Sequence, residues 1–513
     1  MHVVLTRGPL VSTKRAFNNE ATPAIGLASL AGYLRGRGLR VTLFDPIAEG
    51  LNQLSPAPGF EGYVCQGLSF DEILERIPGD TDVLGFSVMF SGEWPVHREL
   101  IKRLRSRLPN ALFVAGGEHI TALTEFVLRD CPALDLCVRG EGERAIADIV
   151  VRRATGGDPR EVDGIGYLDE DGRYVEKGGL TRIVEVDTIP WPYWPEGYLE
   201  KFWSAGKSFG VQFGRDMPIN VSRGCPYRCT FCSSPQMWTT RYVLRDVDDV
   251  VAEIEHYIRA YQIDSLQFYD LTAITKKRWT VEFCRKLIER GIRLRWSLPS
   301  GTRSEALDEE TLGLLREAGC TYLVYAPESG SPRTLERIKK RISLPDLTKS
   351  VLTARRLGIV VRTNLIIGFP GETRRDMFET IRYGLKLAFR GVDEVPINIF
   401  SPYPGSELFA TLRAAGRVTL DDRYFLSLNA INTDYTSMNP MTVNESVGVR
   451  RLALYRLFAM MSNYLIGYLV YPTRIWRTLR NVYGGGASAA TVFEHRLKDA
   501  RKRAMVASEP AKT

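Results

Sequence analysis

Three cysteines stand close together in the stretch Ser222-Arg-Gly-Cys-Pro-Tyr-Arg-Cys-Thr-Phe-Cys-Ser233. Cys225, Cys229 and Cys232 are separated by three and then two residues, and three thiolates can hold three irons of a four-iron cluster. A cluster that only carries electrons normally has four cysteines, and a structural zinc site also has four ligands. The spacing therefore predicts a metal centre with one open position, at which a small molecule can bind.

This stretch resembles the cluster loop of the radical S-adenosylmethionine (SAM) enzymes. In that family a [4Fe–4S] cluster binds SAM at its open iron, and reductive cleavage of SAM gives a 5'-deoxyadenosyl radical. The resemblance implies both cofactors and a reducing partner such as flavodoxin or ferredoxin. The alternative is that these three cysteines are unrelated residues of the hydrophobic core. We expect the other five cysteines, which are scattered along the chain, to be core residues of that kind: Cys65, Cys131, Cys137, Cys284 and Cys320.

Residues 1–155 alternate short apolar segments with amphipathic ones. Five predicted strands are separated by predicted helices, which is typical of a doubly wound parallel sheet. The strands are expected at Val3–Leu5, Val41–Phe44, Asp82–Ser87, Ala111–Ala115 and Leu134–Val138. Ligands of such sheets bind at the carboxyl ends of the strands.

Glycine-rich turns follow three of these strands. Together with the cysteine loop, they resemble the cobalamin-binding domain of the cobalamin-dependent radical SAM enzymes. The resemblance implies that cobalamin contacts five residues at these turns: Ser87, Gly116, Gly117, Gly140 and Glu141. The motif that supplies a histidine ligand below cobalt in other cobalamin proteins cannot be placed on any of the five histidines. We therefore expect His119 to be a hydrogen-bonding loop residue.

Residues 156–217 are predicted to form a linker, with a small hairpin near residues 164–172. Its proline- and tryptophan-rich segment Ile189–Pro195 is expected to pack between domains. Residues 218–412 then show six strand–helix units, which predict a partial parallel barrel with its chemistry at the carboxyl edge. The six strands are expected at Pro218–Ser222, Ser265–Tyr269, Leu294–Ser297, Tyr322–Ala326, Val360–Ile367 and Glu394–Phe400.

Polar residues and glycines follow the barrel strands, and several resemble radical SAM edge motifs. The resemblance implies that Glu328 contacts the SAM ribose, that Asn364 and Asp270 are polar SAM contacts, that Gly368 allows the adenosyl group to approach, and that Phe231 packs near the adenine. Each of these residues taken singly can also serve as a turn or helix-cap residue.

The C-terminal hundred residues are predicted to be mainly helical over 413–484 and to end in a flexible basic tail over 485–513. The run Leu457–Tyr471 is almost wholly apolar and too short to span a bilayer. It can lie at a membrane surface, because arginines follow it, or it can dock on the barrel. We favour docking.

Composition narrows the class of protein. The net charge of +8 is not concentrated in a basic stripe with aromatic residues, so nucleic-acid binding is not expected. The N-terminus reads as a strand and lacks the pattern of a signal peptide. Eight cysteines in 513 residues do not form a disulfide framework. These features favour a cytoplasmic enzyme, with peripheral membrane contact left open.

The two resemblances together imply a methyltransferase that acts on an unactivated carbon of a small molecule, where the radical removes a hydrogen atom and cobalamin supplies the methyl group. The apolar C-terminal run hints at a lipid, isoprenoid or polyketide-like substrate. The alternatives are cobalamin-assisted ring closure or rearrangement without methyl transfer and, in another class, a non-catalytic iron–sulfur protein. A methylthiotransferase would need three more clustered cysteines near the N-terminus.

Overall fold

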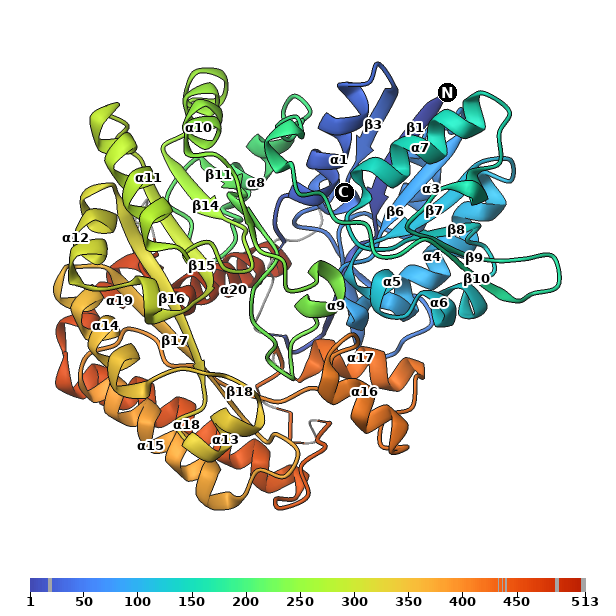
Figure 1. Ribbon diagram of the computed structural model, residues 1–513. Helices are drawn as coiled ribbons and strands as arrows, with labels where there is room; N and C mark the ends of the chain where they lie inside the picture. The colour runs from blue at the N-terminus through green and yellow to red at the C-terminus, as the bar shows by residue number, and fades with distance from the viewer. Residues whose placement is uncertain (17–20, 432, 436, 439–440, 485–488, 509–513) are drawn as a thin grey trace.

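The computed structural model describes residues 1–16, 21–431, 433–435, 437–438, 441–484 and 489–508. Two sheets stand side by side, the first mainly and the second wholly parallel, and a group of C-terminal helices lies against the second sheet (Figure 1). None of the helices in this part of the chain has the length and apolar composition that crossing a bilayer requires.

The first sheet has seven strands in the order β10-β9-β8-β7-β6-β1-β3. Its five parallel strands are those predicted, and buried Val, Leu and Phe side chains fill both of its faces. They are β1 (His2–Arg7), β3 (Arg40–Phe44), β6 (Val83–Ser87), β7 (Leu112–Gly116) and β8 (Leu136–Val138). The doubly wound fold class is confirmed.

Helices flank this sheet, and a small antiparallel sheet lies beside it. The helices are α1 (Ile25–Arg35), α2 (Pro46–Glu49), α3 (Phe70–Arg76), α4 (Trp94–Arg107), α5 (Glu118–Ala122), α6 (Thr124–Asp130) and α7 (Gly142–Ala154), with the 3-10 turns η1 (Ser91–Glu93) and η2 (Pro159–Glu161). The small sheet consists of β2 (Leu10–Thr13), β4 (Leu54–Pro56) and β5 (Tyr63–Gln66).

The predicted linker is ordered and contributes to both domains. Its hairpin, β9 (Ile165–Leu168) and β10 (Tyr174–Lys177), adds two antiparallel strands to the first sheet. After η3 (Val186–Thr188), the Ile189–Pro195 segment packs between α1 and the barrel, because Tyr193 donates its N–H to Ala28 and the Trp191 indole donates to Asp249. The predicted interdomain packing is confirmed, and α8 (Tyr198–Ala205) continues it.

The second sheet is the predicted partial barrel. Six parallel strands pair in sequence order, and the two outer strands do not pair with each other. They are β11 (Asp216–Ile219), β14 (Ser265–Phe268), β15 (Arg295–Thr302), β16 (Cys320–Glu328), β17 (Val360–Ile367) and β18 (Ile397–Ile399). A short ladder, β12 (Ser222–Arg223) with β13 (Val243–Leu244), begins the cysteine loop.

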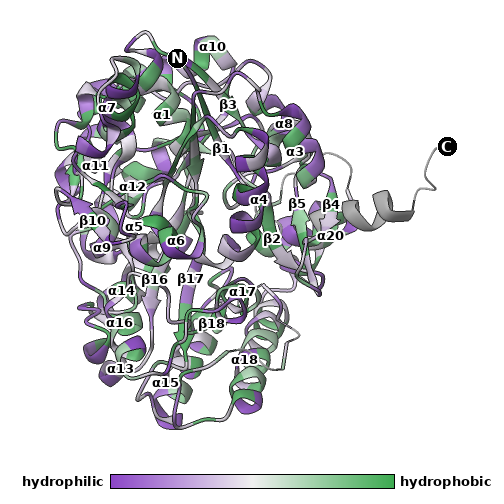
Figure 2. Cartoon of the chain, turned by 90° about the vertical axis from the view of Figure 1, so that its right-hand side faces the viewer, coloured by the Kyte–Doolittle hydropathy of each residue, from purple (hydrophilic) through white to green (hydrophobic). Residues whose placement is uncertain are grey.

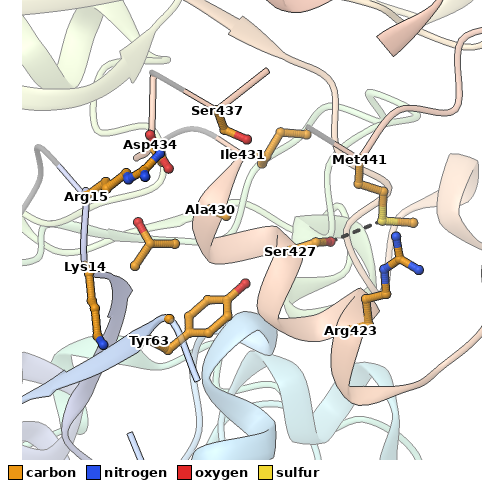
Figure 3. A pocket seen from close by; sticks show the side chains of 12 residues that line it. Lys14, Arg15, Tyr63, Arg423, Ser427, Ala430, Ile431, Asp434, Ser437 and Met441 are labelled. Atoms are coloured by element: carbon orange, nitrogen blue, oxygen red, sulfur yellow. Dashed lines mark hydrogen bonds between the residues drawn. The ribbon is translucent and has the colours of Figure 1, made fainter. Parts of the chain in front are cut away.

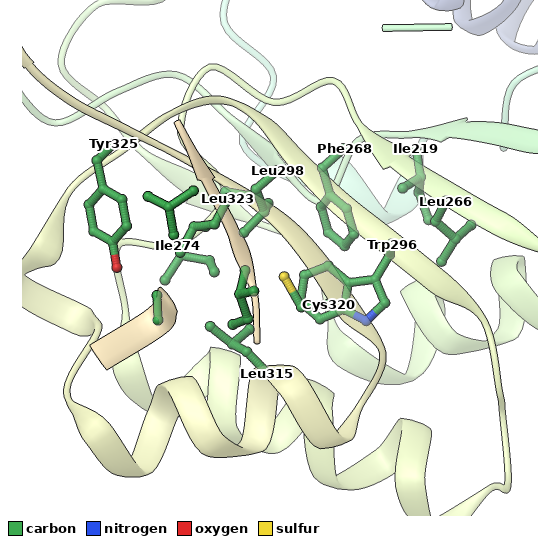
Figure 4. Packing of buried hydrophobic residues seen from close by; sticks show 14 of the residues in the cluster. Ile219, Leu266, Phe268, Ile274, Trp296, Leu298, Leu315, Cys320, Leu323 and Tyr325 are labelled. Atoms are coloured by element: carbon green, nitrogen blue, oxygen red, sulfur yellow. The ribbon is translucent and has the colours of Figure 1, made fainter. Parts of the chain in front are cut away.

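The barrel core lies between the strands and the surrounding helices. Figure 4 shows Phe268, Trp296, Cys320 and Leu323 side by side above the helix that carries Leu315. The helices are α10 (Val247–Tyr261), α11 (Lys277–Glu289), α12 (Glu309–Glu317), α13 (Pro332–Arg337), α14 (Leu344–Arg356), α15 (Arg374–Phe389) and α16 (Glu407–Ala414), with α9 (Ser234–Trp238) inside the cysteine loop region and η4 (Ser304–Ala306) after β15.

The C-terminal region contains α17 (Asp422–Ala430), α18 (Val449–Val470), α19 (Thr473–Tyr483) and α20 (Val492–Ser508). The prediction of a flexible tail over 485–513 is wrong for the part that forms α20. The first residues of α20 are buried, and the backbone N–H groups of Val492 and Phe493 donate to the Glu394 carboxylate below the barrel strands. Residues 485–488 and 509–513 lie outside the described residues.

Candidate functional site

The cysteine loop begins where β11 ends, and a buried carboxylate fixes its start. Asp270, which follows β14, accepts hydrogen bonds from the backbone N–H groups of Val221 (3.0 Å) and Ser222 (2.5 Å) and from the Ser222 hydroxyl (2.6 Å). Burial raises the pKa of Asp270 to about 6. The SAM contact predicted for Asp270 stays a prediction, because the structure shows this carboxylate bound to the start of the cysteine loop.

Gly224 makes the turn into the first cysteine. Its φ is +86°, and a Cβ atom there would lie 2.4 Å from the Arg241 carbonyl oxygen. No side chain fits this position, because the backbone conformation and the close neighbour both require glycine. The Arg-Gly-Cys order in the sequence is therefore a local structural requirement of the loop.

The three loop cysteines differ from the other five. Cys225, Cys229 and Cys232 are partly exposed free thiols, whereas the scattered cysteines are buried, as predicted. Burial raises the pKa of Cys232 to about 12. Within the described part of the chain, no three His, Cys, Asp or Glu side chains converge on a single-ion site, but a cluster needs each thiolate on its own iron, and this loop carries the three-thiol donor set for it.

Two polar contacts bind this loop to the first domain, one on each side of the cysteines. Arg223 pairs with Glu141 (2.8 Å) in the turn after β8 and with Glu143 (2.6 Å) at the start of α7. The Ser233 hydroxyl donates to Glu118, the first residue of α5. We call these two contacts the junction. The pKa of Arg223 is raised, because the effect of the two carboxylates exceeds the lowering effect of burial. The carboxyl edges of both sheets therefore meet at the cysteine loop.

The predicted cobalamin residues lie together on the first-sheet edge. Ser87 and Gly116 are direct neighbours in the ladder between β6 and β7. Gly117 has φ +117° and lies against Val88, where a Cβ atom would be 2.4 Å from the carbonyl oxygen. A Cβ atom on Gly116, in contrast, would meet only the Val138 Cβ atom, at an ordinary contact distance of 3.9 Å.

The other two predicted cobalamin residues belong to the joint between the domains. Gly140 packs on the Thr181 backbone, and Glu141 is buried between Arg182 (3.1 Å) and Arg223. Their predicted contact with cobalamin stays a prediction, since the structure accounts for both residues by these neighbours.

His119 is enclosed in the core. Its Nδ1 lies 2.9 Å from the Ser91 hydroxyl, and its ring lies against Trp94 and Phe425. Burial lowers the pKa of His119 to about 3. The prediction that it is a hydrogen-bonding residue agrees with this position, because both aromatic neighbours cover the ring.

The predicted SAM residues of the barrel lie at or near the ends of β16 and β17. Glu328 has φ +67° in a buried position and pairs with Lys340 (3.1 Å). A non-glycine residue in this region is strained, and such strain is concentrated at functional sites. Asn364 accepts a hydrogen bond from Arg362 (2.9 Å), and the Phe231 ring lies against Phe369.

Gly368 has a different environment from the one expected. Its φ of +89° requires glycine, and a Cβ atom would meet Leu452 of α18 at 2.8 Å. The glycine therefore accommodates the C-terminal helix, and the adenosyl approach predicted for it stays untested.

Unpaired buried polar atoms gather at the barrel edge. Asn220, Thr230, Ser234, Thr272 and Ser401 each carry a buried side-chain oxygen that has no hydrogen-bond partner in the structure. Buried polar groups are nearly always satisfied, so this set fits a bound polar ligand such as SAM. On the facing edge, Met89 and Phe90 are exposed apolar residues after β6, which fits the broad face of a corrin ring.

Sequence reasoning missed two cations near the cysteines. Arg303 follows β15 and lies 3.6 Å above the Tyr227 ring, and Lys340 pairs with Glu328. Both lower the pKa of the Cys225 and Cys229 thiols, although burial raises it overall. Arg303 could have been found from the sequence, because it directly follows a predicted barrel strand. Lys340 could not, because it follows a helix in an ordinary run of basic residues.

A cavity of about 550 Å³ lies apart from the cysteine loop, between the small sheet and α17. Figure 3 shows Lys14, Arg15 and Arg423 around it, with Tyr63 and Ser427 below and beside it. Its lining includes no residue of the loop. The Asp434 carboxylate also lines it, so three cationic side chains and one anionic side chain surround the cavity.

Comparison with known proteins decides the family. Residues 219–384 match the model of the radical SAM superfamily, and residues 19–150 match that of the B12 binding domain. The chain is 30% identical to a cytidylyl-2-hydroxyethylphosphonate methyltransferase of Streptomyces wedmorensis, over 79% of this chain and 80% of the relative. The chain belongs to the cobalamin-dependent radical SAM enzymes.

Two further matches bear on fold and chemistry. An anaerobic magnesium-protoporphyrin IX monomethyl ester cyclase of Rubrivivax gelatinosus is 27% identical over 76% of this chain and 66% of its own length. The solved structure of the radical SAM methyltransferase TsrM from Kitasatospora setae, with cobalamin and a [4Fe–4S] cluster bound, aligns with a TM-score of 0.66 at 16% identity over 99% of this chain and 100% of that chain. The matches to the radical SAM and B12-binding models give the family cofactors, which are a [4Fe–4S] cluster, SAM and cobalamin.

Proposed function

We propose that this enzyme transfers a methyl group to an unactivated carbon of a small-molecule substrate. The observation that carries the proposal is the junction, where the three cysteines lie between Arg223 and Ser233, both of which contact the first domain. When bound, the cluster and SAM supply a carbon radical and cobalamin supplies a methyl group. A substrate between the two edges is within reach of both.

The chain's own residues hold this arrangement in three ways. Asp270 holds the start of the loop through two backbone N–H groups and one hydroxyl. Arg223 keeps the loop against the first domain through a paired, largely buried charge. The Lys340–Glu328 pair gives the barrel edge a fixed carboxylate for a ribose hydroxyl. Such positioning is the protein's main contribution when cofactors carry the chemistry.

The remaining features of the proposal are a hydrophobic substrate, a flavodoxin or ferredoxin as the reductant, and a cytoplasmic location with contact to a membrane. Met89 and Phe90 make this edge apolar, which supports a corrin ring there and an apolar substrate beside it.

The test is anaerobic reconstitution with cobalamin, a reductant and SAM that carries a deuterated methyl group. Extracts of cells lacking the enzyme serve as the substrate source, and products are compared by mass. We expect one compound to gain a labelled methyl group, with 5'-deoxyadenosine formed in parallel. A product that forms with 5'-deoxyadenosine but gains no label would favour the rival, ring closure or rearrangement without methyl transfer.

A further inference from the structure

The outward face of α18 is apolar. Its exposed residues Leu454, Phe458, Met461, Leu465 and Leu469 follow one another at intervals of three or four, so they form one stripe along the helix. Leu465 is 59% exposed and Leu469 is 71% exposed. The segment docks on the barrel, as predicted, because α18 packs against α15 and β18. These large apolar side chains, however, face outward and are not covered by the barrel.

The composition of the inward face of α18 explains why its large apolar side chains face outward. It consists largely of small and polar residues, which let the helix lie close to α15 and β18: Leu452, Ala453, Arg456, Ala459, Asn463 and Gly467. Arg456 is fully buried and donates to backbone carbonyls of the segment around Ile431, and Asn463 donates to Val395 (2.8 Å). The polar groups that hold α18 in place thus leave its large apolar side chains outside. Figure 2 shows α18 at the edge of the molecule beside α15.

The next helix, α19, has the same arrangement. Arg474 donates to Val392 (3.1 Å), Arg477 pairs with Asp393 (3.1 Å) and Glu494, and Asn481 donates to Glu494 (2.8 Å). The opposite side exposes Ile475, Trp476, Leu479 and Tyr483, and Trp476 is 73% exposed. A helix that turns its charges to the protein and its apolar side outward is built to meet an apolar phase.

Helix α15 extends the same surface. Phe378 lies against Tyr455 of α18, and the Phe389 carbonyl accepts a hydrogen bond from Tyr471. Both phenylalanines are exposed, and Arg382 and Lys386 lie between them on the same side of the helix. We call the exposed apolar residues of α15, α18 and α19 the outer face.

The charge around the outer face selects its partner. The chain has no acidic residue between Glu445 and Glu494, and Arg450, Arg451 and Arg480 are exposed there. None of these three, nor Arg382 or Lys386, has a carboxylate partner among the described residues. A second copy docking by the same face would bring like charges together, whereas anionic headgroups would neutralise them.

We propose that the outer face docks on the surface of a membrane that contains anionic phospholipid. The apolar side chains enter the headgroup and upper acyl region, and the arginines and lysine contact the phosphates. Because the inner faces of α18 and α19 stay packed on the protein, the helices lie along the surface. This inference does not depend on the reaction catalysed.

The test is flotation of the full chain with vesicles of phosphatidylcholine alone or with phosphatidylglycerol. We expect binding that is stronger with phosphatidylglycerol and weakens as salt rises. The double variant Leu465→Glu/Trp476→Glu should lose at least tenfold in affinity. The control is Leu54→Glu, an exposed leucine of β4 that belongs to none of the helices of the outer face, and this variant should bind as the parent does.

Charge variants test the second half of the proposal. Arg382→Gln and Lys386→Gln should each lower affinity for anionic vesicles by up to about fivefold and leave binding to neutral vesicles unchanged. Should Leu465→Glu/Trp476→Glu not fold, the milder Leu469→Ser is measured in the same way. The proposal is overturned by an absence of vesicle binding at low salt, by equal loss in Leu54→Glu, or by a dimer in light scattering that Leu465→Glu/Trp476→Glu converts to a monomer.

Discussion

The junction and the outer face are opposite exceptions to the rule that charged side chains are exposed and large apolar side chains are buried. At the junction, Arg223 lies largely buried with Glu141 and Glu143. On the outer face, large apolar residues such as Leu465 and Trp476 stand in solvent. Soluble proteins tolerate either exception only where it serves a purpose. The first exception positions two cofactor edges, and the second marks a surface that another phase covers.

The largest effect separates catalysis from docking. Cys225→Ala removes a thiolate that nothing else in the loop replaces, so we expect cluster binding and 5'-deoxyadenosine formation to be abolished while the protein stays folded. Vesicle flotation should be unchanged, because the outer face lies on other helices. Normal 5'-deoxyadenosine formation by this variant, or by Cys229→Ala or Cys232→Ala, would refute the cluster assignment.

The junction should be sensitive to loss of its buried charge. Arg223→Met leaves the Glu143 carboxylate without its partner and Glu141 with Arg182 alone, so we expect the free energy of unfolding to fall by about 3 kcal/mol. Chemical denaturation measures this. The control is Arg129→Met, whose partner Glu125 is exposed, with an expected loss of under about 1 kcal/mol. Equal losses in the two variants would show that the junction charge has no special role.

Two neighbouring glycines distinguish fold from cofactor contact. Gly117→Ala meets the Val88 carbonyl and keeps a positive φ, so unfolding should become easier by about 2 kcal/mol. The added methyl group of Gly116→Ala makes only an ordinary 3.9 Å contact with the Val138 Cβ atom, so stability should change by under about 0.5 kcal/mol. Cobalamin binding, followed by absorbance, should weaken. Unchanged cobalamin affinity in Gly116→Ala would show that cobalamin does not bind against this edge of the first sheet.

His119 should make the stability of the folded protein decrease as the pH falls. Its folded pKa of about 3 lies below its ordinary value of 6.5. Below pH 6.5 the unfolded chain binds a proton that the folded chain does not, so its contribution lowers stability as pH falls, by about 1.4 kcal/mol per pH unit. His119→Asn should remove this slope between pH 6 and pH 5 and leave the absorbance of bound cobalamin unchanged. A changed cobalamin spectrum would make His119 a cobalt ligand.

The outer face should give the smallest effect on stability. Leu465→Glu changes a side chain that is 59% exposed, so the free energy of unfolding should stay within about 0.5 kcal/mol of the parent. Thermal or chemical denaturation without lipid measures this. A loss of several kcal/mol would restore the view that α18 buries this residue.

The sequence predicted most of the fold because its signals are local. The alternation of short apolar segments with amphipathic ones located all six barrel strands. The pairing of Arg223 with Glu141 and Glu143 was out of reach, because it joins residues about eighty positions apart. The orientation of α18 was out of reach for another reason: the helix is apolar almost all round, so periodicity cannot say which side faces the protein.

The central claim is that the junction brings the cluster and cobalamin to one substrate space. Electron paramagnetic resonance of the anaerobically reconstituted protein, with cobalt as Co(II) and the cluster reduced, tests it most directly. We predict that each signal broadens and relaxes faster than in protein loaded with one cofactor alone, because the two spins are close. Two signals that simply add, each with the relaxation of the singly loaded protein, would contradict the account.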